Sequence, residues 1–170
     1  MTNSIEHLCT FSVGGFRLGV DALRVREVLR PQPMTRVPRA PESVKGLINL
    51  RGQIVTAIDL GRLLGLPAAT PAAINVVIRS DWGMASFLVD DMGEVERVSG
   101  GFEPVPSNTP AAFRSLLRGV VPRDGELLLV LDPDAVLGAP PLGESPFHST
   151  GMAIDDPSRV DGRSPWESTK

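Results

Sequence analysis

Residues 44–60 read VKGLINLRGQIVTAIDL and contain the clearest structural pattern in the chain. Two runs of β-branched and other apolar residues, 45–50 and 53–58, flank the dipeptide Arg51-Gly52. A glycine in so short a polar break can adopt the positive φ that a tight turn needs. The pattern therefore predicts a β-hairpin.

A short helix is predicted directly after this hairpin. Asp59 offers a side-chain oxygen to the first free amides of a helix. The spacing of Leu60, Leu63 and Leu64 gives that helix one apolar face, and Gly65 is suited to end it. Strand, turn, strand and capped helix are thus expected in this order.

Three further pairs of short apolar runs enclose turn residues, which also predicts hairpins. They cover residues 8–13 with 16–20, 74–79 with 84–89, and 116–121 with 126–131. Single strands are expected over 25–29 and 92–98, a second Asp-capped helix over 132–137, and irregular chain over 100–115.

Many short strands indicate an all-β fold whose sheet edges must be closed, as small barrels do. Sixteen prolines and seventeen glycines separate the apolar runs. Residues 54–64 and 127–137 repeat the order of strand and Asp-capped helix, which suggests two related halves with a division near 67–72. Residues 139–170 are rich in Pro, Gly, Ser and charge, so a disordered tail is expected there.

Composition excludes several classes of function. A net charge of −3 leaves no global basic field for nucleic acid or an anionic membrane. The single cysteine, Cys9, rules out an intrachain disulfide. The N-terminus lacks the pattern of a secretion signal, and no apolar run is long enough to span a bilayer. We expect a cytoplasmic protein that does not insert into the membrane.

No combination of residues favours catalysis, a metal or a cofactor. His7 and His148 fall in the expected N-terminal approach and tail, where geometry is not fixed. Cys9 lies inside an apolar strand, where a thiol is usually a buried hydrophobe. Asp90 and Asp91 are neighbours on a predicted strand and would point to opposite faces. We therefore expect a protein without enzymatic activity.

Five blocks of the chain, in order, carry a family resemblance. The hairpin and helix fit the pattern G-[ILV]-x-N-L-R-G-x-I-[VP]-x-x-[IV]-D-L, and the other four are FSVGGFRLGVDALRVREVLRP (11–31), MTRVPRAPESVKG (34–46), SFLVDDMGEVERV (86–98) and LLRGVVPRDGELLLVLDPDAVL (116–137). Together they resemble the CheW family of chemotaxis coupling proteins. The resemblance implies two packed five-stranded SH3-like β-barrel subdomains with short helices, within a domain of residues 1–138.

The resemblance also implies a function. It points to a non-enzymatic scaffold that couples the cytoplasmic tips of methyl-accepting chemoreceptors to the regulatory domain of a CheA-type histidine kinase, recruited to receptor arrays at the membrane. An alternative keeps the adaptor fold in a non-flagellar array that controls surface behaviour or second-messenger synthesis. A third possibility, an adaptor fused to a receiver domain, would need roughly one more domain of alternating strands and helices.

The candidate binding surface centres on Glu27 and Arg51. An arginine fork suits a carboxylate, and Glu27 is a charge between apolar neighbours. The resemblance places both beside a receptor-contacting groove, while a purely structural salt bridge remains the alternative. It also suggests apolar contacts from five residues, each of which taken alone is more often core than contact: Val25, Val28, Ile54, Met92 and Val95.

Overall fold

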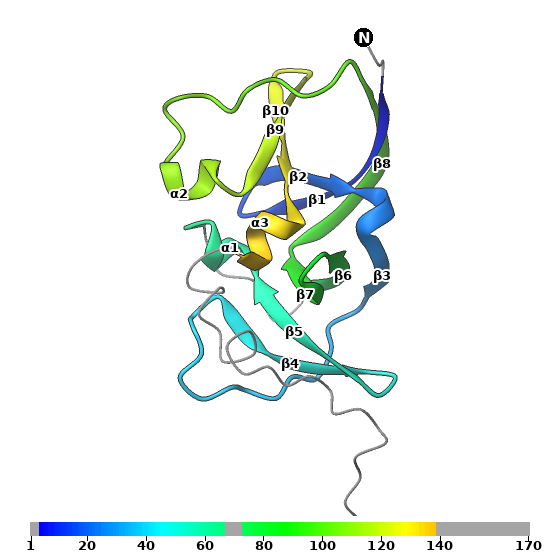
Figure 1. The fold of residues 1–170 in the computed structure, drawn as a ribbon, viewed down its shortest axis with the longest axis vertical. Coiled ribbons are helices and arrows are strands. Elements are labelled where there is room, and N and C mark those ends of the chain that lie inside the picture. The colour runs from blue at the N-terminus through cyan, green and yellow to red at the C-terminus, as the bar shows by residue number, and fades with distance from the viewer. Residues whose placement is uncertain (1–3, 67–72, 139–170) are drawn as a thin grey trace, which may run out of the picture.

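The computed structural model describes residues 4–66 and 73–138, and in them the chain is all-β (Figure 1). The strands are β1 (Ile5–Val13), β2 (Phe16–Asp21), β3 (Val25–Leu29), β4 (Val44–Leu50), β5 (Gln53–Asp59), β6 (Ile74–Ser80), β7 (Gly83–Val89), β8 (Asp91–Ser99), β9 (Leu117–Arg123) and β10 (Glu126–Leu131). The helices are the 3₁₀ turn η1 (Ala22–Arg24), α1 (Leu60–Leu63), α2 (Ala111–Arg114) and α3 (Pro133–Gly138).

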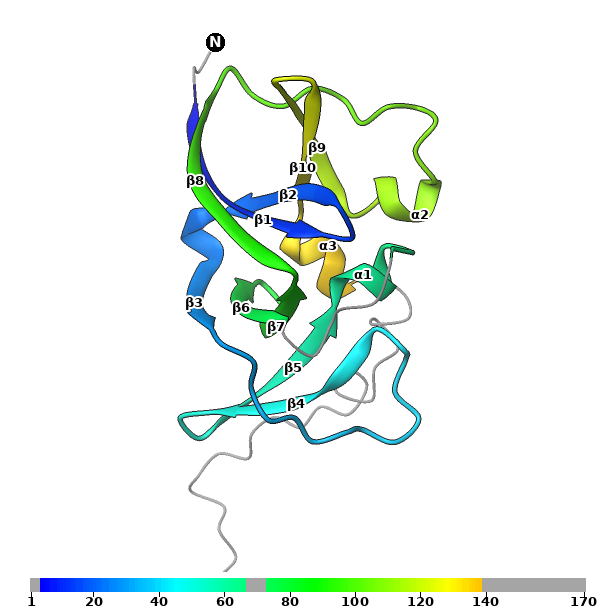
Figure 2. The ribbon, with the colours of Figure 1, turned by 180° about the vertical axis from the view of Figure 1, so that it is seen from behind.

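The strands form two five-stranded sheets, with the orders β8-β1-β2-β10-β9 and β3-β6-β7-β5-β4. Each curls into a small barrel, and the two barrels pack together, one above the other in Figures 1 and 2. In both views the long strand β8 runs beside β1, its antiparallel partner. The predicted all-β fold with two SH3-like barrels is confirmed.

The two barrels exchange their first hairpins. Hairpin β1–β2 joins β8, β9 and β10, through a parallel pairing of β2 with β10. Hairpin β6–β7 joins β3, β4 and β5, through a parallel pairing of β7 with β5. The sheet changes between β2 and β3 and again between β7 and β8. The barrels are therefore not divided near residues 67–72, where the division was expected, because the strands on both sides of that segment share one sheet.

The same segment does separate two structural repeats. β1 to β5 followed by α1 have the same order and pairing as β6 to β10 followed by α3. Even the bridges outside the strands correspond, since Thr35 pairs with Leu47 and Glu103 with Val120. The repeat suggested by the Asp-capped helices is thus present, with its hairpins exchanged. Residues 67–72 themselves, and the predicted tail 139–170, lie outside the described residues.

The turns follow from local residue choice. Arg51 and Gly52 both have positive φ, 53° and 87°, which matches the type I′ turn that suits the twist of a hairpin. The Asn49 side chain accepts a hydrogen bond of 2.9 Å from the Gly52 amide. Asp124 and Gly125 repeat the pair with φ of 38° and 82°.

The predicted helix caps are present. The Asp59 Oδ1 accepts a hydrogen bond from the Arg62 amide at 3.1 Å, which satisfies one of the free donors of α1. Asp132 does the same for α3, accepting from the amides of Asp134 at 3.0 Å and Ala135 at 3.2 Å. Both helices are thereby fixed at the ends of parallel-paired strands.

One apolar core spans both barrels. One buried cluster contains Phe11 and Leu18 of hairpin β1–β2 and Phe87 of hairpin β6–β7. It also contains Leu60 of α1 and Val136 of α3. Full burial of each such side chain stabilises the fold by roughly 1.5–3 kcal/mol. The barrels are therefore joined by shared core rather than by a linker alone.

Three local expectations need correction. His7 lies in β1 and pairs with Arg97, because β1 begins at Ile5, three residues before the predicted start; its side chain is exposed. Pro41 can start a single helical turn, which was expected over residues 42–43; these residues instead form a turn closed by a hydrogen bond from the Val44 amide to the Pro41 carbonyl. The short helix α2 lies within the 100–115 segment that was expected to be irregular.

Candidate functional site

Glu27 and Arg51 form an ion pair of 2.9 Å between Oε1 and Nη2. Glu27 comes from β3, and Arg51 from the turn between β4 and β5. The Arg51 side chain is 85% exposed and that of Glu27 33%. The structure thus brings together the two charges that the resemblance placed side by side, at an exposed rim of the barrel.

The sheet geometry explains how Glu27 reaches this rim. β3 pairs with β6 through Glu27 and Val77, with a register shift between Val25 and Glu27. Such a bulge bends a strand and re-aims its side chains. Along β3, Val25 and Glu27 are half-buried, whereas Val28 is exposed.

The apolar candidates differ in exposure. Val28 is 45% and Ile54 59% exposed, so both are available for contact with a partner. Val25 is partly buried and packs against the core. All three belong to the same barrel as the Glu27–Arg51 pair.

Met92 and Val95 lie on β8, in the other barrel. Met92 pairs with Phe11 and packs against the core, whereas Val95 pairs with Cys9 and is 60% exposed. The seven predicted site residues are therefore distributed over both barrels. Their part in binding stays a prediction.

The second barrel has its own charge cluster, which the sequence did not indicate. Glu96 on β8 forms ion pairs with Arg17 of β2 and with Arg123 of β9, the latter at 3.3 Å from Nε. Like the Glu27–Arg51 pair, it joins strands that are not neighbours in the sheet order. These residues are far apart in sequence, so no local pattern could have revealed the cluster.

Four cations around a surface hollow were also missed. They are Arg36, Arg39, Lys45 and Arg62. A signal was available, because the segment 34–45 carries three of them in a chain of negative net charge.

No catalytic arrangement is found in the part of the chain that is described. Burial raises the pKa of the Cys9 thiol, which keeps it in the unreactive protonated form. No three His, Cys, Asp or Glu side chains of residues 4–66 and 73–138 gather as a metal site. His148 lies outside these residues.

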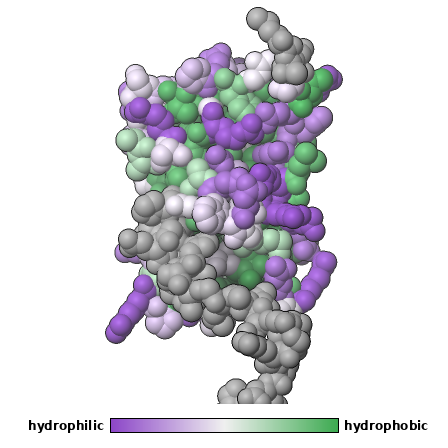
Figure 3. Space-filling view, in the orientation of Figure 1, coloured by the Kyte–Doolittle hydropathy of each residue, from purple (hydrophilic) through white to green (hydrophobic). Residues whose placement is uncertain are grey.

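None of the helices in residues 4–66 and 73–138 is long and apolar enough to cross a membrane, and the longest has six residues. Hydrophilic and apolar residues are interspersed over the face shown in Figure 3.

Comparison with known proteins agrees with the fold and with the motifs. The profile of the CheW-like domain matches residues 7–140. The chain is 32% identical over 139 residues to the chemotaxis protein CheW of Rhizobium meliloti, covering 80% of this chain and 90% of that protein. It is 27% identical over 129 residues to the chemotaxis protein CheW of Thermotoga maritima, covering 75% and 85%.

A solved structure shares the architecture. The crystal structure of the scaffolding protein TtCheW from Thermoanaerobacter tengcongensis superposes with a TM-score of 0.70 at 21% identity, covering 81% of this chain and 95% of that one. Its match supports the fold alone, while the profile match spans both barrels. On these grounds the chain belongs to the CheW-like domain family.

Proposed function

We propose that this protein is a non-enzymatic adaptor that joins the cytoplasmic tips of methyl-accepting chemoreceptors to the regulatory domain of a CheA-type histidine kinase. The observation that carries the proposal is the extent of the family match, which runs from residue 7 to 140 and takes in both barrels. Relatives are named chemotaxis proteins, and the solved one is described as a scaffolding protein. Recruitment to receptor arrays at the membrane would follow from receptor binding.

Such a role needs no chemistry on this chain. An adaptor that holds receptor and kinase together raises their effective concentration. It also shifts the kinase between two states if it contacts those states differently. The two barrels share one core, so partners bound to different barrels would be held close to each other.

We assign partner contacts to the seven residues predicted from the sequence. On the β3–β7 barrel, Glu27 and Arg51 supply charge, and Val28 and Ile54 supply exposed apolar surface. Val95 does so on β8 of the other barrel. The half-buried Val25 and Met92 would support the contacts from beneath.

A binary pull-down tests the proposal. A receptor cytoplasmic fragment and a kinase regulatory domain, both from the same cell, are each offered to the wild-type protein, to Arg51→Ala and to Arg79→Ala. Arg79 is a matched control, since it is exposed on β6 of the same barrel and forms no ion pair with the described residues.

We expect the wild type and Arg79→Ala to retain both partners, and Arg51→Ala to retain less receptor. Wild-type protein that retains neither partner would overturn the proposal. Partners encoded beside this gene would show whether the array serves chemotaxis or another output.

A further inference from the structure

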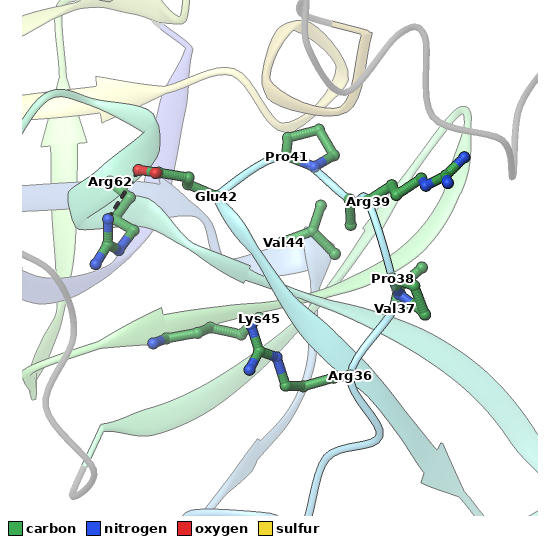
Figure 4. A pocket seen from close by; sticks show the side chains of 10 residues that line it. Arg36, Val37, Pro38, Arg39, Pro41, Glu42, Val44, Lys45 and Arg62 are labelled. Carbon is green, nitrogen blue, oxygen red and sulfur yellow. Dashed lines mark hydrogen bonds and ion pairs between the residues drawn. The ribbon is translucent and has the colours of Figure 1, made fainter.

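A basic hollow of about 860 Å³ lies beside the connection from β3 to β4 (Figure 4). Its lining contains Arg36 and Arg39 from that connection, Lys45 from β4 and Arg62 from α1. Glu42 is the only acidic residue in the lining. The lining thus contains four cations and one carboxylate, in a chain whose net charge is −3.

Most of this positive charge has no internal partner. Glu42 is engaged by Arg62, with Oε2 and Nη1 2.9 Å apart. No acidic side chain of residues 4–66 or 73–138 forms an ion pair with Arg36, Arg39 or Lys45. All three side chains are exposed. The hollow is therefore electrostatically uncompensated within the described protein.

The connection is held in one shape. Arg39 has φ of 63°, in the left-handed region that costs a non-glycine residue roughly 1–3 kcal/mol and persists only when the surroundings fix it. The Ala40 amide donates a hydrogen bond of 3.3 Å to the Val37 carbonyl, and the Val44 amide donates one of 2.9 Å to the Pro41 carbonyl. Because the backbone is already ordered, a ligand would not have to order it on binding.

The lining indicates which anion fits. It contains no aromatic residue on which a nucleobase could stack. At the start of α1 the Arg62 amide already donates to Asp59, so it is not free to bind a phosphate. Apolar side chains, among them Val37, Pro41 and Val44, alternate with the cations. This mixture suits a ligand with both carboxylates and apolar groups.

The cations also point in different directions. In Figure 4 the Arg39 side chain extends to the opposite side of the connection from Arg62 and Lys45. A single small anion could not engage both sides, whereas an extended chain could. We propose that the basic hollow binds an acidic, amphipathic segment of a partner protein, in which aspartate or glutamate alternates with apolar residues. This inference does not rest on the proposed adaptor role.

Fluorescence anisotropy tests it on the full chain. The probe is a short labelled peptide of glutamate and leucine, with a peptide of lysine and leucine as control. The variants are Arg36→Glu with Lys45→Glu, a milder pair with Gln at both positions, and Arg79→Glu with Arg97→Glu as the charge-matched control. The last two positions are exposed and lie outside the hollow.

We expect the acidic peptide alone to bind, with an affinity that falls as salt rises because the charges are exposed. The Arg36 and Lys45 reversal should weaken it about tenfold, the Gln pair less, and the control pair under about twofold. Three results would each overturn the proposal: no binding of the acidic peptide by wild type, equal loss in both reversals, or displacement of the peptide by an equal concentration of inorganic phosphate.

Discussion

Glu27 and Arg51 connect the two edges of one five-stranded sheet. β3 stands at one end of the order β3-β6-β7-β5-β4, and Arg51 directly follows β4 at the other end, yet their side chains are 2.9 Å apart. Only a sheet curled into a barrel allows this contact. Since an exposed ion pair is worth about 0–1 kcal/mol, stability alone gives little reason to place two charges here.

Reversal of one charge of this pair should affect binding more than folding. We expect Glu27→Arg to change the free energy of unfolding by less than about 1 kcal/mol and to weaken receptor binding. Circular dichroism during urea unfolding and a pull-down with the receptor fragment measure the two effects. The swap Glu27→Arg with Arg51→Glu restores an ion pair, and we expect receptor binding to stay weak. Recovery of binding in the swap would make the pair purely structural.

Gly46 and Gly119 occupy corresponding places in the two repeats and should not tolerate a side chain. A Cβ at Gly46 would lie 2.6 Å from the Thr35 carbonyl oxygen, and one at Gly119 would lie 2.7 Å from that of Glu103. Alanine at either position should lower the free energy of unfolding by about 1–3 kcal/mol, measured by urea titration. Gly19→Ala is the control, because its nearest neighbour would be at 3.4 Å. Equal losses at all three positions would contradict the account.

The buried hydroxyl of Ser43 should lower the free energy of unfolding of the protein. It is buried and has no hydrogen-bond partner in the described part of the chain. The corresponding residue of the second repeat is Leu116. The Ser43 carbonyl accepts a hydrogen bond from the amide of the helix cap Asp59, and the Leu116 carbonyl accepts one from the amide of the cap Asp132. We expect Ser43→Ala to raise the free energy of unfolding by about 1 kcal/mol.

Ser86→Ala is the matched comparison for that test. Its hydroxyl is equally buried but donates to the Asn75 side chain at 3.0 Å, so its removal should lower the free energy of unfolding by about 1 kcal/mol. Thermal unfolding followed by circular dichroism gives both values. A loss of stability in Ser43→Ala as large as in Ser86→Ala would show that Ser43 has a partner in solution.

The Cys9 thiol should react slowly in the native state, and its titration should lower the free energy of unfolding at alkaline pH. Burial raises its pKa, so folding favours the protonated form. That contribution to stability is complete below the ordinary thiol pKa and is lost as pH rises through the raised one. At about pH 8, a thiol reagent should label the native protein at least about tenfold more slowly than the urea-unfolded protein. Equal rates would place Cys9 at the surface.

Hairpins and caps could be predicted because their signals are local. Arg51-Gly52 and Asp124-Gly125 specify turns by their own backbone preferences, and Asp59 and Asp132 cap the helices that follow them. The exchange of hairpins could not be predicted. It depends on the parallel pairings of β2 with β10 and of β5 with β7, which join strands far apart in sequence and leave no periodic trace.

The candidate site was predictable only in part, because its residues lie far apart in sequence. The pairing of Glu27 with Arg51 followed from the family resemblance, because 24 positions separate the two residues and no spacing rule connects them. The basic hollow was missed, since it forms only when α1 brings Arg62 to the connection that carries Arg36 and Arg39. The exposure of single side chains could not be predicted either, since the sequence does not distinguish the exposed Val95 from the half-buried Met92.

Co-sedimentation tests the adaptor role most directly. A receptor cytoplasmic fragment and the kinase are sedimented together without this protein, with wild type, and with Arg51→Ala, and the kinase in the pellet is measured. The account predicts that wild type brings the kinase down with the receptor, and that Arg51→Ala does so much less. If the amount of sedimented kinase is the same with and without the wild-type protein, the chain does not couple the two.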